Sequence, residues 1–149
     1  MTEDFRDLLS ALVDADAKFL VVGAHALAAH GVPRVTGDLD VWVEPTAENA
    51  GRVWSALAAF GAPLASLEVQ ESDFATPDIV AQIGLPPYRI DLMTSISGVT
   101  FAEAWTGRLE STLLDVPVSF LGRDEFIRNK RACGRPKDLG DIAALGDRS

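Results

Sequence analysis

The chain has 149 residues, of which 48% are hydrophobic and 23% charged, and its formal net charge is −9. These values are typical of a single folded domain, residues 1–149, with an ordinary core. The negative charge argues against nonspecific DNA or RNA binding, which depends on Lys and Arg neutralising phosphates. It leaves open an RNA substrate bound at a local basic patch.

Membrane and secretory classes are not expected. The uncharged run over 19–33 is too short to span a bilayer and is interrupted by Gly, His and Pro. The amino terminus is acidic and amphipathic, unlike a secretory signal. The single cysteine, Cys133, cannot form an intrachain disulfide, which agrees with a reducing compartment. We therefore expect a cytoplasmic protein.

Hydrophobic periodicity predicts helices that alternate with strands in the first half of the chain. Thr46 is expected to cap the third helix, and Gly61 to end it. In chain order, the predicted elements are a helix over 5–13, a strand over 19–22, a helix over 24–31, a strand over 38–43 and a helix over 46–61.

The second half of the chain is predicted to add strands first and helices last. The predicted elements are strands over 79–83 and 88–93, a short helix around 101–105, a last strand over 116–121, and helices over 124–131 and 136–145. This order predicts an α/β (α+β) domain in which a small mixed sheet is flanked by helices and followed by a short helical tail.

Two aspartates at the start of the predicted strand DLDVWV place two negative charges on one face of an otherwise apolar segment. Asp38 and Asp40 point to the same face, roughly 6–7 Å apart along the strand. They repel each other when both are ionised, and a divalent cation would remove that conflict. The alternative is a solvated strand edge, where Asp deters pairing with other chains.

A third carboxylate and a glycine turn extend this pattern. Asp91 lies between apolar residues of another predicted strand, so three carboxylates converge if that strand lies beside the Asp38 strand. Gly23 ends a strand and begins a helix, a turn whose N–H groups can bind phosphate. The combination indicates a metal–phosphate site, where two divalent ions about 3.5–4 Å apart orient a phosphate.

The segment VVGAHALAAHGVPRVTGDLDVWV resembles the signature of the nucleotidyltransferase superfamily with the DNA polymerase beta-like fold. Gly23-Ala24 is followed, after thirteen residues, by Asp38-Leu39-Asp40, and Asp91 matches the third family acid. Asn129-Lys130 and the segment GRPKDLGDIAAL resemble the tail of small bacterial nucleotidyltransferase-like proteins. These include toxin components of the abortive-infection type of toxin–antitoxin system.

The resemblance implies the reaction and the residues that perform it. A nucleoside monophosphate would pass from an NTP, such as ATP, to a hydroxyl of an RNA or protein acceptor, and an antitoxin would be a partner. The catalytic acids, which ligate Mg²⁺ or Mn²⁺, would be Asp38, Asp40 and Asp91. The nucleotide-binding residues would be Gly23, Ala24, Lys130, Lys137 and Asp141.

Several features favour a second hypothesis, a catalytically degenerate domain of this fold that binds nucleotide or a partner protein. Ala24 replaces the usual Ser or Gly, and the chain is shorter than many relatives. Lys137 and Asp141 have the i, i+4 spacing of a surface ion pair worth about 0.3–0.5 kcal/mol. Five other side chains have two interpretations each. Arg34 and Thr36 either contact a phosphate or belong to an ordinary solvated loop. His25 and His30 either contact the nucleotide or have a structural role, and Trp42 lines the pocket or lies in the core.

Overall fold

The computed structural model describes residues 2–34, 36–85 and 88–146. Its helices are α1 (Thr2–Asp14), α2 (Gly23–Ala29), α3 (Ala47–Phe60), the 3₁₀ helix η1 (Glu71–Ala75), α4 (Phe101–Thr106), α5 (Arg123–Cys133) and α6 (Pro136–Ala144). Its strands are β1 (Phe19–Val22), β2 (Asp38–Val43), β3 (Val80–Leu85), β4 (Tyr88–Met93), β5 (Leu109–Leu113) and β6 (Val116–Phe120).

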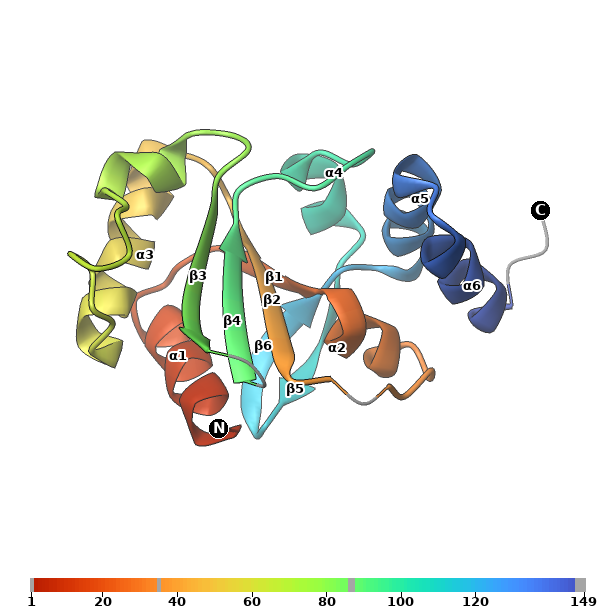
Figure 1. Ribbon diagram of the computed structural model, residues 1–149, viewed down its shortest axis with the longest axis horizontal. Helices are drawn as coiled ribbons and strands as arrows, with labels where there is room; N and C mark the ends of the chain where they lie inside the picture. Colours follow the sequence, from red (N-terminus) through yellow and green to blue (C-terminus); the bar gives the residue numbers. More distant parts are fainter. Residues whose placement is uncertain (1, 35, 86–87, 147–149) are drawn as a thin grey trace.

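The strands form one mixed sheet in the order β3-β4-β2-β1-β6-β5 (Figure 1). The central strands β1 and β2 are antiparallel to each other. Each has a parallel neighbour on its outer side, β6 beside β1 and β4 beside β2. The edge strands β3 and β5 pair antiparallel with β4 and β6. The predicted α+β domain, a mixed sheet flanked by helices with a helical tail, is confirmed.

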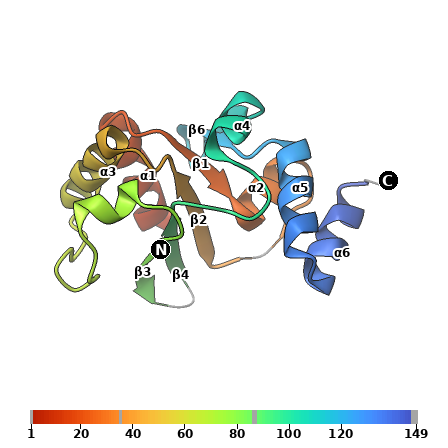
Figure 2. The same ribbon diagram turned by 90° about the horizontal axis from the view of Figure 1, so that it is seen from above.

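Helices cover both sides of this sheet. Figures 1 and 2 show α1 and α3 together on one side, and α2, α5 and α6 on the other. The apolar face of α1 is buried because Leu8, Leu9 and Leu12 repeat at helical spacing, and each is 0% exposed. All four residues of β1 are buried, as expected of a central strand covered on both faces. None of the described helices is long and apolar enough to cross a membrane.

Local signals in the sequence account for the ends of α3. The Thr46 hydroxyl accepts a hydrogen bond from the backbone N–H of Asn49 at 3.2 Å, as an N-cap does. At the other end Gly61 has φ +88°, a left-handed conformation that glycine adopts without steric cost. Both predictions for this helix are confirmed.

Two elements were not predicted. The strand β5 has the sequence LESTL, whose three central residues are exposed, so it lacks the apolar alternation of a half-buried strand. The 3₁₀ helix η1 is five residues long and buries only Phe74, which is too little for a periodic signal. The last strand, β6, therefore pairs in a hairpin with β5, a strand that its residue pattern does not reveal.

Candidate active site

The two acidic strands lie side by side at the centre of the sheet. The strands β2 and β4 are parallel neighbours, and their register places Asp40 opposite Asp91 and Asp38 opposite Arg89. On the other side of β2, Asp40 is opposite Val22, the last residue of β1. The conditional prediction that the Asp91 strand lies beside the Asp38 strand is confirmed, and it brings the three carboxylates together.

An arginine that the sequence analysis did not assign lies within this cluster. The Arg89 Nε atom is 3.2 Å from Oδ1 of Asp91, and its Nη2 atom is 3.5 Å from Oδ2 of Asp38. Arg89 precedes Asp91 by two positions in β4, so both side chains project from the same face. That spacing was the signal available in the sequence. The guanidinium partly offsets the mutual repulsion of the acids.

Repulsion and burial nevertheless leave Asp40 hard to ionise. Its pKa is raised from 3.8 to about 6, first by burial, then by the charges of Asp91 and Asp38, while Lys130 opposes the rise. The pKa of Asp91 is also raised, mainly by burial and against the effect of Arg89. Asp40 and Asp91 thus behave as a coupled pair that prefers to retain a proton or to bind a cation.

The glycine at the start of α2 allows the backbone to approach these acids closely. Gly23 has φ +68°, and a Cβ atom at this position would collide with the carboxylate of Asp40. A side chain would therefore meet both backbone strain and a steric clash. Gly23 places the β1–α2 turn directly against the acid cluster, where its N–H groups are available to a phosphate.

These residues open into a cavity of about 220 Å³ between the sheet and the helical tail. Asp38, Asp40 and the glycine turn line it together with basic side chains from α5, α6 and the loop before β2, whereas Asp91 is not among the lining residues. The lining residues are Gly23, Ala24, Leu27, Arg34, Thr36, Asp38, Asp40, Phe126, Lys130, Arg135, Lys137 and Asp141. All five residues proposed to bind nucleotide are among them.

Three of these basic residues, Arg34, Lys130 and Arg135, pair with two buried acids of α6. Asp138 contacts Arg135, with Nε to Oδ2 at 2.6 Å, and lies 3.6 Å from the Lys130 Nζ atom. The hydrogen bond from Arg135 lowers the pKa of Asp138 to about 2. Asp141 pairs with Arg34, Nη1 to Oδ1 at 2.6 Å. The alternative that Lys137 and Asp141 form a surface ion pair is wrong, because Asp141 is buried and its partner is Arg34.

The remaining side chains with two interpretations are largely structural. Trp42 is 1% exposed and packs edge-on against Phe101, so the core interpretation is correct. The His30 Nε2 atom lies 2.8 Å from the carbonyl oxygen of Leu121 and links α2 to β6. His25 packs edge-on against Phe5, and burial lowers its pKa, which favours the neutral form.

The acid pair fits a divalent cation that arrives with a phosphate. Within residues 2–34, 36–85 and 88–146, no group of three His, Cys, Asp or Glu side chains could hold a metal ion by itself. Mg²⁺, however, is usually bound by one or two carboxylates together with substrate phosphates. Asp38 and Asp40 supply two such carboxylates at the cavity, and the pKa of Asp40 is raised first by burial and then by the neighbouring negative charges, which a cation would offset.

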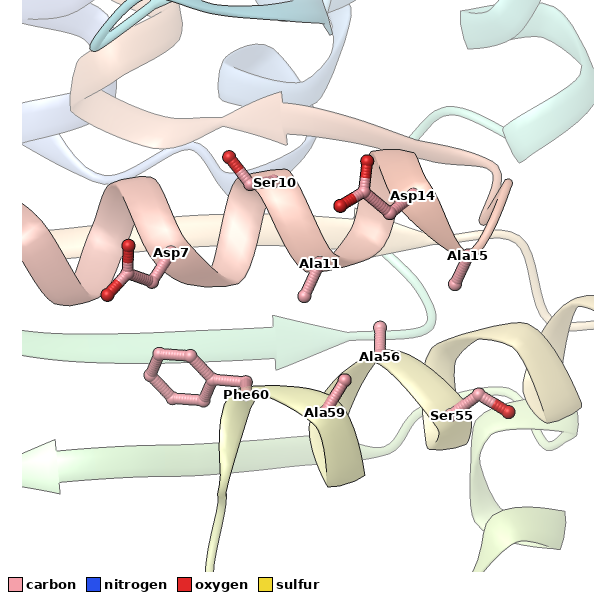
Figure 3. Close-up of a pocket in the computed structure, with 9 residues that line it drawn as sticks. All are labelled: Asp7, Ser10, Ala11, Asp14, Ala15, Ser55, Ala56, Ala59 and Phe60. Carbon is pink, nitrogen blue, oxygen red and sulfur yellow. The ribbon is translucent and has the colours of Figure 1, made fainter.

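A larger cavity, of about 530 Å³, lies elsewhere, between α1 and α3 (Figure 3). Its polar groups are the carboxylates of Asp7 and Asp14 and the hydroxyls of Ser10 and Ser55, and four alanines and Phe60 form the rest. None of the described residues that line it is basic, and it lies across the sheet from the acid cluster. The smaller cavity is the candidate active site because it alone combines acids, cations and a glycine turn among the cavities described here.

Comparison with known proteins supports the fold. No protein-family model matches the sequence, and no curated protein matches it either. Solved structures that are similar include the following two. A candidate nucleotidyltransferase from Thermotoga maritima is 13% identical, with a TM-score of 0.60 over 95% of this chain and 86% of its own. ANT(2")-Ia, solved in complex with adenylyl-2"-tobramycin, is 16% identical, with a TM-score of 0.62 over 97% of this chain and 88% of its own. The chain therefore has the fold of these nucleotidyltransferases.

Proposed function

We propose that the protein transfers a nucleoside monophosphate from an NTP to a hydroxyl group. The observation that carries this proposal is the cavity in which Asp38 and Asp40 face Lys130 and Lys137, with Asp91 beside Asp40. A site for binding alone has no need of three mutually repelling carboxylates. Phosphoryl transfer uses such a cluster, because developing charge must be stabilised where the phosphate reacts.

Each wall of the cavity has a role in this reaction. The N–H groups at Gly23 and Ala24 and the ammonium groups of Lys130 and Lys137 would bind the β- and γ-phosphates. Asp38 and Asp40 would hold Mg²⁺ or Mn²⁺, which when bound supplies positive charge beside the α-phosphate. The acceptor oxygen then attacks the α-phosphorus, the bond to the β-phosphate oxygen breaks, and pyrophosphate leaves.

Asp91 is the proposed acceptor of the proton from the hydroxyl. It lies beside Asp40 in the neighbouring strand, and burial raises its pKa, which makes it a stronger base than an exposed Asp. Arg89 contacts Asp91 at 3.2 Å and would fix the orientation of its carboxylate beside Asp40. Loss of Asp91 should therefore affect the chemical step more than nucleotide binding.

The acceptor that we propose is a hydroxyl of RNA or protein, and the protein would act as a toxin controlled by an antitoxin. The support is the resemblance of the segment from Asn129 to Leu145 to that group. ANT(2")-Ia was solved with an adenylylated antibiotic, adenylyl-2"-tobramycin, so a small-molecule hydroxyl is the competing acceptor. A gene for an antitoxin beside this one would support the toxin role.

A transfer assay tests the proposal. The protein is incubated with each of the four labelled NTPs, with Mg²⁺ or Mn²⁺, and with total RNA, cell protein or tobramycin in separate reactions. We expect label to appear in RNA or protein, and no transfer by the control variant Asp38→Asn/Asp40→Asn. If the wild type transfers no label under any of these conditions, the alternative holds, and the domain only binds nucleotide or a partner.

A further inference from the structure

Two acidic residues of α6 are buried and paired with cations of the cavity. Asp138 and Asp141 lie three positions apart and therefore share one face of the helix. Their side chains are 0% and 5% exposed. Carboxylates are rarely buried unless they are paired. Asp138 holds Lys130 and Arg135, and Asp141 holds Arg34, so this face of α6 fixes three cations at the cavity wall.

The pair formed by Arg34 and Asp141 differs from an ordinary surface ion pair. Its two atoms are 2.6 Å apart, and the Asp141 side chain is almost fully buried. Among the described residues, no group reaches Oδ1 of Asp141 with hydrogen-bond geometry, so the charge of Arg34 is what offsets its burial. Asp141 cannot also bind a phosphate, because two anions would then meet in a buried place.

Arg34 retains the capacity to bind a second anion. A guanidinium has five N–H donors in a fixed fork, and a carboxylate engages at most part of that fork, here at Nη1. The side chain is 37% exposed and lines the cavity with Gly23 and Lys130. An arginine that recognises phosphate is commonly held by a carboxylate on one side of its guanidinium. The carboxylate sets the orientation of the guanidinium, and the remaining N–H groups bind the phosphate.

The size of the cavity indicates which part of a nucleotide Arg34 meets. At about 220 Å³ the cavity is smaller than the ~300–1,000 Å³ that encloses a drug-sized ligand. It can therefore take the phosphate chain of a nucleotide while the sugar and base remain outside. Arg34 lies in this enclosed part, together with the cations of the helical tail.

We propose that Arg34 binds a non-bridging oxygen of the nucleotide's phosphate chain, and that Asp141 is a positioning residue that acts through Arg34. The identity of the ligand, a nucleoside triphosphate, rests on the proposed function. The inference changes the role of Asp141 from a nucleotide contact to a support for one. It also adds Arg34 to the residues that select polyphosphate.

Calorimetric titration of the full chain with inorganic tripolyphosphate tests the role of Arg34. The variant Arg34→Met should bind about 10- to 100-fold more weakly than the wild type, the cost of a lost charge-assisted hydrogen bond. Arg34→Lys should recover part of the loss, because it restores charge without the fork. The control is Arg52→Met, since Arg52 is 39% exposed and paired with Glu48 at 2.7 Å on α3, across the sheet.

A double-mutant cycle tests the role of Asp141. Asp141→Asn should weaken tripolyphosphate binding in the wild-type background and cause no further loss in the Arg34→Met background. A further loss there would show that Asp141 acts directly, and would overturn the positioning role. If Asp141→Asn does not fold, the Arg34 series decides, because equal binding by Arg34→Met and wild type refutes the inference.

The outcome is separable from that of the transfer assay. A wild-type protein that binds tripolyphosphate through Arg34 but transfers no label refutes the proposed function and supports this inference. If the wild type transfers label and Arg34→Met binds tripolyphosphate as tightly as the wild type, the proposed function is supported and this inference is refuted. A wild type that binds no tripolyphosphate overturns the inference.

Discussion

Replacing Asp40 by Asn should stabilise the metal-free protein at neutral pH. The pKa of Asp40 is raised from 3.8 to about 6, so the folded protein holds this proton more tightly than the unfolded chain. The stability of the fold therefore falls as the pH rises from about 4 to about 6, and the full penalty remains above that window. Asn is nearly isosteric and carries no charge, so the variant avoids the penalty.

The size of the effect follows from the difference between the two pKa values. Each pKa unit corresponds to about 1.4 kcal/mol, so the rise from 3.8 to about 6 gives about 3 kcal/mol as an upper limit. Asp40 is partly exposed, and water screens part of this, which leaves roughly 1–2 kcal/mol. For a domain near this size, each kcal/mol changes Tm by about 2–4 °C. We expect a gain of about 2–8 °C.

The assay is thermal unfolding in EDTA at pH 4 and pH 7.5, followed by circular dichroism. The gain from Asp40→Asn should be present at pH 7.5 and small at pH 4, where the wild-type carboxyl is largely protonated. Asp7→Asn is the matched control, because Asp7 is an exposed acid on α1 (Figure 3), the helix that lies across the sheet from the cluster. A variant that melts below the wild type at pH 7.5 would refute the reasoning and make Asp40 a hydrogen-bonding part of the architecture.

Three further predictions concern the same site. Asp91→Asn should keep nucleotide affinity within several-fold while transfer falls by ~10²-fold or more in the label assay, and equal rates would remove Asp91 from the mechanism. Saturating Mg²⁺ should raise Tm by several degrees, since a ligand at one hundred times its Kd contributes about 2.7 kcal/mol to the free energy of unfolding. Asp38→Asn/Asp40→Asn should abolish this rise in the same thermal unfolding assay. Gly23→Ala should lower Tm more than Gly31→Ala, because both have positive φ (+68° and +96°) but only Gly23 faces a carboxylate that its Cβ would strike. A similar loss in both variants would leave backbone strain as the whole effect.

The acid cluster could be predicted because each of its parts is local in the sequence. Asp38 and Asp40 fall on one face of a strand by simple alternation, and Gly23 follows a strand of four apolar residues. Arg89 was also within reach, two positions before Asp91. Its role was missed because a lone arginine in a strand is usually solvated, and only the register of β2 and β4 places it between two carboxylates.

The ion pairs that hold the cations of the cavity, Arg34 with Asp141 and Lys130 and Arg135 with Asp138, could not be predicted in the same way. Arg34 and Asp141 are more than a hundred residues apart, and no periodic pattern connects them. The spacing of Lys137 and Asp141 instead suggested a surface ion pair, which assumes that the polar face of α6 is exposed. The fold turns that face inward toward α5, so Asp138 and Asp141 are buried, and tertiary packing overrides the local rule.

The strand order has a consequence for how the domain forms. The two central strands, β1 and β2, are consecutive strands in the sequence and pair with each other, so the middle of the sheet can form before its flanks. Each flank then arrives as a local antiparallel hairpin, β3–β4 on one side and later β5–β6 on the other. Hairpins close over short loops, whereas the two parallel pairings, β4 with β2 and β6 with β1, join segments farther apart in the sequence, so we expect these pairings to form more slowly. The pairing of β4 with β2 brings Asp91 beside Asp40, and α5 and α6, which carry Lys130 and Lys137, follow β6 in the sequence, so the candidate active site is complete only when the whole sheet has formed.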